Sequence, residues 1–255
     1  MPPSLPALLR ALLDLALPPG CPACGATPAP GQAFCPACRQ EIMLLGPGAC
    51  PRCGLPRPPG SLEQTCLGCR FDPPPQDRLI CLGLHQGPLA RALRDFKYRR
   101  HLAAGAALGR FLAQGLASVI LPQAQVLTPV PLHYRRLWRR GFNQSLLLAR
   151  ALAGQAEPGN RPLLAPRLLS RLRHTRPQVG LAMQARQDNV AGAFAVNPRQ
   201  ASLVKGRRVV LVADVYPTGA TVGECARVLK EAGATQVTVV TLARAPGRGP
   251  GPAEV

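Results

Sequence analysis

The sequence predicts an open, mainly parallel α/β sheet preceded by a small cysteine-rich module, and three observations support this fold class. Eight of the ten cysteines lie in four CxxC pairs between residues 21 and 69. After the loop FDPPPQD, the chain changes to alternating helical and strand patterns. The last third holds a βαβ unit whose first strand is a continuous apolar run, which is typical of a parallel sheet covered on both faces.

The length and composition predict one main domain with a smaller module attached. The chain has 255 residues, of which 47% are hydrophobic, so it can bury a sizeable core. An apolar segment near the N-terminus is interrupted by Arg10 and Asp14, which favours an amphipathic helix over a signal or a membrane span. We therefore expect a cytoplasmic protein that does not span a membrane. The predicted parts are an N-terminal amphipathic helix at 1–18, the cysteine module at 19–72, the α/β domain at 79–245 and a flexible tail at 246–255.

The cysteine pairs have the spacing of two consecutive zinc ribbons, C-x2-C-x10-C-x2-C followed by C-x2-C-x12-C-x2-C. Two thiolates separated by two residues can bind one metal ion, and a second pair completes a tetrahedral site. Four redox CxxC pairs without a surrounding βαβ pattern would be unusual, whereas a cross-braced pairing stays open. Four protein ligands close each site, so we expect two structural zinc ions that supply most of the module's folding free energy. The predicted ligands are Cys21, Cys24, Cys35, Cys38, Cys50, Cys53, Cys66 and Cys69.

The α/β domain begins with apolar residues at helical spacing over 91–120, which predict two helices broken near Tyr98. A short strand at 126–131 follows, and then a helix with Asn143 as its N-cap and Gly154 at its end. The βαβ unit consists of a strand at 207–214, a helix that ends at Gly233, and a strand at 235–244. Ligands are expected at the carboxyl ends of such strands, where residues 214–221 lie.

The segment after the strand in the βαβ unit can hold an anion. Backbone N–H groups of four residues at the start of a helix point to one place, with the helix dipole behind them. Two hydroxyls add donors, and a glycine allows close approach. An ordinary strand-to-helix turn with threonine caps is the alternative. The predicted anion-binding residues are Thr218, Gly219, Ala220 and Thr221.

Four stretches of the chain resemble one family. The segments CPACG, VPLHYRRLWRRGFNQSLLLARAL and RQDNVAGAF, with the turn YPTGAT, occur in the order found in the ComF family of competence proteins. The resemblance implies a type I phosphoribosyltransferase-like domain behind a double zinc ribbon. It also implies a pocket for a phosphoribosyl ligand such as phosphoribosyl pyrophosphate with Mg²⁺. The cellular role that it implies is cytoplasmic: to help receive incoming single-stranded DNA at the inner face of the membrane. A DNA-uptake translocase or another competence protein is the implied protein partner.

The strand-end loop departs from the family pattern at two positions. Such loops usually begin with two acidic residues that contact the ribose and the metal, but here Ala213 replaces the first and only Asp214 remains. The residue before the threonine is Pro217, which has no N–H to donate to a phosphate. By the same resemblance, Lys97 and Arg140 are candidates for the pyrophosphate side. We therefore expect a retained ligand pocket without efficient transfer; an active phosphoribosyltransferase acting on a nucleobase-like acceptor and a phosphoribosyl sensor are the alternatives.

Positive charge is concentrated in the α/β domain. The formal net charge is +19, and residues 81–255 hold 25 Lys+Arg against 7 Asp+Glu. This asymmetry favours a polyanionic partner; the alternative, a compositional bias, explains the preference for Arg over Lys better than it explains the small number of acidic residues. Arginines alternate with aromatic residues in HYRRLWRRGFNQ, a pattern that suits single-stranded nucleic acid. The candidates are Arg135, Arg136, Trp138, Arg139 and Arg140; a small-ligand role for the arginines and a core position for Trp138 are the alternatives.

Overall fold

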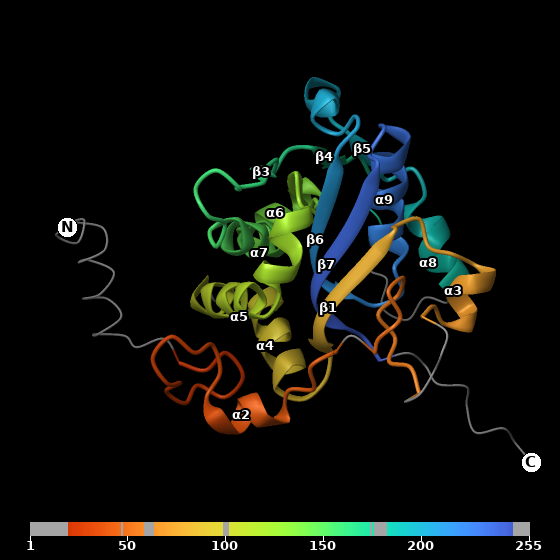
Figure 1. The fold of residues 1–255 in the computed structure, drawn as a ribbon. Helices are drawn as coiled ribbons and strands as arrows, with labels where there is room; N and C mark the ends of the chain where they lie inside the picture. The colour runs from red at the N-terminus through yellow and green to blue at the C-terminus, as the bar shows by residue number, and fades with distance from the viewer. Residues whose placement is uncertain are drawn as a thin grey trace, which may run out of the picture.

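Five parallel strands form the central sheet of the protein, in the order β1-β7-β6-β2-β3 (Figure 1). The computed structural model describes residues 20–46, 48–58, 64–98, 102–173, 175 and 183–246. The predicted helix at 1–18 and residues 247–255 of the predicted tail lie outside this part. The predicted open parallel sheet is confirmed. Its strands are β1 (Arg78–Leu84), β2 (Val126–Pro129), β3 (Leu163–Leu164), β6 (Arg208–Tyr216) and β7 (Gln236–Arg244).

Strand β6 lies at the centre of the sheet, and its side chains alternate between two apolar layers. Val210 and Val212 belong to a buried cluster with α5 (Leu102–Ile120) and α7 (Gln144–Ala153). Leu211 and Ala213 belong to a second cluster with α9 (Ala220–Glu231). Both faces of the strand are therefore covered, which explains why its sequence is apolar without interruption.

The helices cover the sheet as the pattern predicts. Helix α4 (Gly87–Tyr98) and α5 are separate, and with α7 they lie on one face, while α9 and α8 (Met183–Val190) lie on the other (Figure 1). In α7, the side chain of Asn143 accepts a hydrogen bond from the Ser145 amide at 3.0 Å, and Gly154 is the C-cap, so both predicted ends are confirmed. Helix α9 ends at Glu231, two residues before the predicted Gly233, which has a φ of 94°.

Among the described residues, one helical segment is long and apolar enough to cross a membrane by length and composition: Ala103–Gln123, which comprises nearly all of α5 and the 3-10 turn Leu121–Gln123 after it. Within the protein, 67% of this window is buried. The helix packs against α7 and joins the apolar layer under β6. Its apolar sequence is therefore used in the core of the domain.

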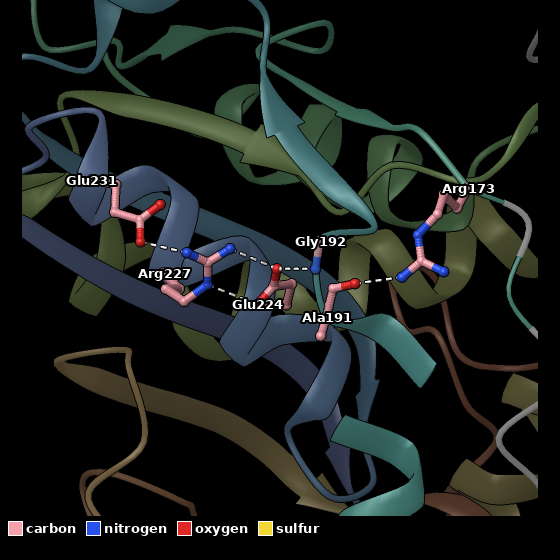
Figure 2. Close-up of polar contacts among 6 residues, drawn as sticks. All are labelled: Arg173, Ala191, Gly192, Glu224, Arg227 and Glu231. Atoms are coloured by element: carbon pink, nitrogen blue, oxygen red, sulfur yellow. Dashed lines mark hydrogen bonds and ion pairs between the residues drawn. The ribbon is translucent and has the colours of Figure 1, made fainter. Parts of the chain in front are cut away.

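A second, two-stranded antiparallel sheet of β4 (Leu169–Arg171) and β5 (Phe194–Val196) is attached to α9. The turn before β5 is fixed by a carboxylate, because Oε1 of Glu224 accepts a hydrogen bond from the Gly192 amide at 2.7 Å (Figure 2). Arg227 forms ion pairs with Glu224 and with Glu231, and Arg173 donates to the carbonyl of Ala191 (Figure 2). The hydrogen bond between Glu224 and Gly192 thus attaches the two-stranded sheet to α9, the helix that begins at the turn after β6.

The cysteine module contains two short helices, α2 (Pro36–Glu41) and α3 (Leu67–Phe71), and its two halves contact different parts of the α/β domain. Its first half packs on α5, where the rings of Phe34 and Phe111 meet edge to face at 5.0 Å. Its second half reaches the edge strand, since the Leu79 amide donates to the carbonyl of Pro51 at 2.7 Å. The two halves of the module therefore rest on different parts of the domain.

Candidate functional site

The turn between β6 and α9 joins a buried strand to a helix start. Gly219 is the N-cap of α9 and has a φ of 88°, a left-handed conformation that favours glycine. Because the N-cap is a glycine, no threonine occupies the N-cap position itself. The hydroxyl oxygen of Thr218 is buried and has no hydrogen-bond partner within the described ranges. The first N–H groups of a twelve-residue helix and this hydroxyl form a suitable place for an anion.

Asp214 lies within β6, four residues before Thr218 of the turn, and its side chain forms an ion pair with Lys97 at the end of α4. The Nζ to Oδ2 distance is 3.0 Å, and about one fifth of each side chain is exposed. Burial opposes ionisation of this carboxyl group, but the charge and hydrogen bond of Lys97 and the amide of Val215, at 2.8 Å from Oδ1, hold the pKa of Asp214 below its ordinary value of 3.8. The carboxylate is therefore ionised at neutral pH and already neutralised by a lysine.

Arg140 lies on the same side of the sheet edge, at the end of α6 (Tyr134–Arg140). Its positive charge also lowers the pKa of Asp214. Its guanidinium donates to Oε1 of Gln144 at 3.1 Å, and the Nε2 atom of Gln144 is buried without a hydrogen-bond partner in the described part of the chain. The structure thus brings together three of the predicted residues, Lys97, Arg140 and Asp214, at the carboxyl ends of β2 and β6.

His85 belongs to this group but was not predicted from the sequence. It directly follows β1, and its amide donates to the carbonyl of Arg244 at 2.7 Å. Burial and the nearby charge of Lys97 lower the pKa of His85 below its ordinary value of 6.5, against the opposing effect of Asp214. The imidazole is therefore neutral at pH 7. The signal in the sequence was its place after the apolar run RLICLGL, the same strand-end rule that identified Asp214.

Helix α6 presents an exposed aromatic and basic surface beside this site. The side chain of Trp138 is 87% exposed and that of Tyr134 is 66% exposed. Phe142, by contrast, stacks on Phe96 with ring centroids 5.4 Å apart. The alternative that placed Trp138 in the core is therefore wrong, and Phe142 is the packed aromatic residue of this run.

The four arginines of α6 have different surroundings. Arg135 and Arg139 are exposed, and the guanidinium of Arg135 lies over the Tyr134 ring at 5.9 Å. Arg136 is half-buried and donates to the carbonyl of Thr175 at 2.9 Å. Together with the half-buried Arg140, Arg136 faces the protein and not the solvent. The exposed residues of α6 are Tyr134, Arg135, Leu137, Trp138 and Arg139. We call its aromatic and basic members, Tyr134, Arg135, Trp138 and Arg139, the α6 surface.

The eight cysteines of the CxxC pairs form two clusters in chain order. In each cluster the four sulfur atoms lie within 4.8 Å of one another, which excludes the cross-braced alternative. The Sγ atoms of Cys24 and Cys35 are 3.6 Å apart, as are those of Cys53 and Cys66. A tetrahedral zinc ion with Zn–S bonds of about 2.3 Å requires sulfurs about 3.8 Å apart, so both clusters fit this ion.

In each cluster, backbone N–H groups lower the pKa of one thiol. Burial raises the pKa of Cys21, but the amides of Cys35, Ala23 and Cys24 outweigh it and lower the pKa to about 7. The equivalent Cys50 has the same arrangement and also a pKa of about 7. Metal binding requires thiolates. The first CxxC pair of each cluster, Cys21–Cys24 and Cys50–Cys53, which we call a knuckle, therefore favours the thiolate through the same kind of backbone contacts.

Comparisons with known proteins identify the family to which the two parts of the chain are similar. Residues 12–70 match a double zinc ribbon domain, and residues 162–252 match a phosphoribosyl transferase domain. Competence protein F of Haemophilus influenzae is 32% identical over 188 residues, which cover 71% of this chain and 79% of that protein. The DNA utilization protein YhgH of Salmonella typhi is 36% identical over 73% of this chain and 81% of its own length. The chain belongs to the ComF/YhgH family. A more distant relative, competence protein ComFC of Bacillus subtilis, is 26% identical over 84% of this chain.

Ala213 and Pro217, the two positions at which the loop departs from the family pattern, both have structural roles in this member of the ComF/YhgH family. Ala213 faces the apolar layer under α9, with an exposed fraction of 4%, and so lies on the opposite side of β6 from Asp214. The carbonyl of Pro217 accepts a hydrogen bond from the guanidinium of Arg244 at 2.9 Å. In this member of the family, both positions are thus used for packing and for fixing the turn.

Proposed function

We propose that this ComF/YhgH family protein helps to take up or handle incoming single-stranded DNA in natural transformation, with a phosphoribosyl-binding pocket that is degenerate for catalysis. Its relatives carry the names competence protein and DNA utilization protein. The observation that carries the proposal is the exposure of Trp138, at 87%, on a helix whose exposed neighbours include two arginines. Trp138 is exposed together with Tyr134 and Leu137 of the same helix, and a cluster of exposed apolar side chains is typical of an interaction site.

The α6 surface has the composition of a single-strand binding site. Every base offers a flat face, so stacking on Trp138 and Tyr134 is independent of sequence. Arg135 and Arg139 supply charges for the phosphates between stacked bases. The rest of the domain adds to the attraction, since 18 of the 19 net positive charges lie in residues 81–255, where 25 Lys+Arg face 7 Asp+Glu.

The pocket beside the α6 surface is proposed to bind a phosphoribosyl ligand. The 5′-phosphate would lie at the start of α9, near the unpartnered hydroxyl of Thr218. Asp214 would contact the ribose or a Mg²⁺ ion, and Lys97 and Arg140 would face the pyrophosphate. Transfer is disfavoured because a second carboxylate is missing at Ala213, and because Lys97 neutralises the one that remains.

DNA binding is tested by fluorescence anisotropy with a labelled single-stranded oligonucleotide. Trp138→Ala and the double variant Arg135→Ala/Arg139→Ala should each weaken binding, and the affinity of the wild type should fall steeply with salt because phosphate contacts release counterions. A double variant at two other exposed arginines, Arg150→Ala/Arg199→Ala, removes the same charge elsewhere and serves as the control. If both double variants weaken binding equally, the α6 surface is not a specific site.

A working phosphoribosyltransferase is the second candidate, and the ionised Asp214 next to an anion-binding turn favours it. Pyrophosphate release from phosphoribosyl pyrophosphate with Mg²⁺ and candidate bases separates the two functions. We expect no turnover above that of the variant Asp214→Asn. Clear turnover that this variant lacks would establish the enzyme and refute a degenerate pocket.

The cellular setting is part of the same proposal. The protein would act in the cytoplasm, at the inner face of the membrane, where single strands arrive. The zinc ribbons would support docking to a DNA-uptake translocase or another competence protein. Co-purification of such a partner from competent cells, compared with a variant that lacks residues of the α6 surface, separates protein docking from DNA-mediated association.

A further inference from the structure

The second cysteine cluster and the turn between β6 and α9 are connected by two buried side chains. Gln76 precedes β1 and is 0% exposed, while Arg244 ends β7 and is 6% exposed. The Nε2 atom of Gln76 and the guanidinium of Arg244 are hydrogen-bonded, while the Oε1 atom of Gln76 is buried without a partner among the described residues. Each of the two has one partner in the Cys50–Cys53 knuckle and another in or next to the turn.

Gln76 contacts the knuckle through the backbone of Arg52. Its Nε2 atom donates to the carbonyl of Arg52 at 3.0 Å and to the hydroxyl of Tyr216 at 2.9 Å. The guanidinium of Arg52 returns a hydrogen bond to the carbonyl of Gln76 at 3.1 Å. The amide of Gln76 thus holds the phenol of Tyr216 at a fixed distance from a metal-binding knuckle.

Arg244 forms the more direct connection. Its Nε atom donates to the carbonyl of Cys53, a predicted zinc ligand, at 2.7 Å. The NH1 atom of the same guanidinium donates to the carbonyl of Pro217 at 2.9 Å and to that of Tyr216 at 3.3 Å. One planar, rigid guanidinium group is thus hydrogen-bonded both to the backbone of Cys53 and to the backbone of the turn.

Tyr216 transmits this constraint to the start of α9. The guanidinium of Arg244 lies over its ring at 5.2 Å, and its hydroxyl lies so close to Gly219 that a Cβ atom at that position would be 2.3 Å from it. Gly219 is the N-cap with a φ of 88°. The direction of the first amides of α9 therefore depends on where Tyr216 lies.

The first cysteine cluster provides a natural comparison because its recorded contacts lie elsewhere. Gly31 accepts a hydrogen bond from Gln114 at 3.1 Å, and Phe34 packs on Phe111. Both partners belong to α5, on the opposite side of the sheet from α9. Two sites with the same ligands thus differ in whether they contact the turn.

We propose that the second cysteine cluster, when it holds its metal, fixes the conformation of the anion-binding turn, and that Arg244 and Gln76 are the positioning residues that carry this effect. The function of the turn as a phosphate site rests on the function proposed above, but the coupling itself does not. Loss of this metal loosens the turn and weakens anion binding, whereas loss of the first metal leaves both unchanged.

Amide hydrogen exchange tests the coupling without any ligand. Arg244→Gln should keep two zinc ions per chain, and exchange of the peptide over 215–223 should rise about tenfold while exchange in α5 stays as in the wild type. Cys66→Ser should lose one zinc ion and show the same local change. Cys24→Ser, in the first cluster, should lose one zinc ion without changing this peptide. Unchanged exchange at 215–223 in both Arg244→Gln and Cys66→Ser would overturn the proposal.

Calorimetry with phosphoribosyl pyrophosphate and Mg²⁺ then separates the coupling from the proposed ligand. We expect the wild type to bind, and we expect the affinity to fall about tenfold in Arg244→Gln and in Gln76→Met but not in Cys24→Ser. This result would support both the coupling and the phosphoribosyl ligand. Equal binding by the wild type and Arg244→Gln refutes the coupling and leaves the pocket in place. No binding by the wild type, together with the expected exchange pattern, refutes the ligand and supports the coupling. Arg244→Lys keeps the charge without the planar fork and should not restore the wild-type behaviour.

Discussion

The Nζ atom of Lys97 lies 3.0 Å from the Oδ2 atom of Asp214, so the last residue but one of α4 neutralises the carboxylate of the central strand. Replacing Lys97 with Met should raise the pKa of Asp214, because burial disfavours the carboxylate and its main compensating charge is removed. A carboxyl titration followed by NMR measures the change. Lys205→Met removes an exposed lysine elsewhere and should leave this pKa unchanged. An unaltered pKa in Lys97→Met would show that the amide of Val215 or the charge of Arg140 is sufficient.

The same ion pair predicts how stability depends on pH. Since the folded state lowers the pKa of Asp214 below its ordinary 3.8, the carboxylate stabilises the fold above that value, and this contribution is lost as the pH falls through the lower, folded-state pKa. The difference in the free energy of unfolding between wild type and Asp214→Asn should therefore be largest near neutral pH and shrink below about pH 4. Denaturant titrations across this range measure it. A difference that is constant with pH would assign the effect to shape and not to charge.

Metal content is predicted by the two cysteine clusters. The purified protein should hold two zinc ions per chain, and Cys24→Ser should hold one, because a site with three thiolates binds zinc less tightly. Cys225→Ala changes a cysteine buried under the sheet, outside both clusters, and should retain two. Elemental analysis after dialysis provides the count. One zinc ion in the wild type would show that only one cluster is a metal site.

The sequence predicts the centre of the fold well because the signals there are local. The apolar run of β6, the cap at Asn143 and the glycines after the helices each depend on a few neighbouring residues. The seven-residue edge strand β1 and the two-residue strand β3 are not predicted, and both pair with strands that are distant in sequence. The CxxC spacing likewise indicates two metal sites, but only the structure excludes the cross-braced pairing.

The candidate site is predicted less completely than the fold, because its residues come from several strands and helices that meet only in the folded protein. Asp214 and the turn are contiguous in sequence and can be identified by pattern. His85 and Gln144 acquire their roles only by approaching Lys97 and Arg140 in space. Burial separates residues that the sequence treats alike, as with Arg136 and Arg139 in one run of arginines.

The α6 surface predicts that stability and DNA binding can be separated. Trp138→Ala should change the free energy of unfolding by no more than about 0.5 kcal/mol, because the side chain is 87% exposed. It should weaken single-strand binding by roughly 1–3 kcal/mol if one base stacks on the indole. Phe96→Ala, at a fully buried ring, should instead cost about 3–5 kcal/mol of stability. Thermal unfolding and anisotropy on both variants test the separation, and a large stability loss in Trp138→Ala would place the indole against the protein.

Ala213 is the position where the family pattern suggests a carboxylate and the structure argues against one. Ala213→Asp places a charge among the apolar residues under α9 and should cost about 3–5 kcal/mol at neutral pH, because the cluster around this position consists of hydrophobic side chains. The buried carboxyl has a raised pKa, so the penalty should decrease as the pH falls toward about 4 and the group becomes neutral. Ala213→Asn has the same shape without the charge, and its cost should not vary with pH in this way. Calorimetry with phosphoribosyl pyrophosphate on Ala213→Asp should show no gain in affinity. A stable variant that binds more tightly would mean that the ligand reaches the α9 side of β6, and that the missing carboxylate alone keeps the pocket from transfer.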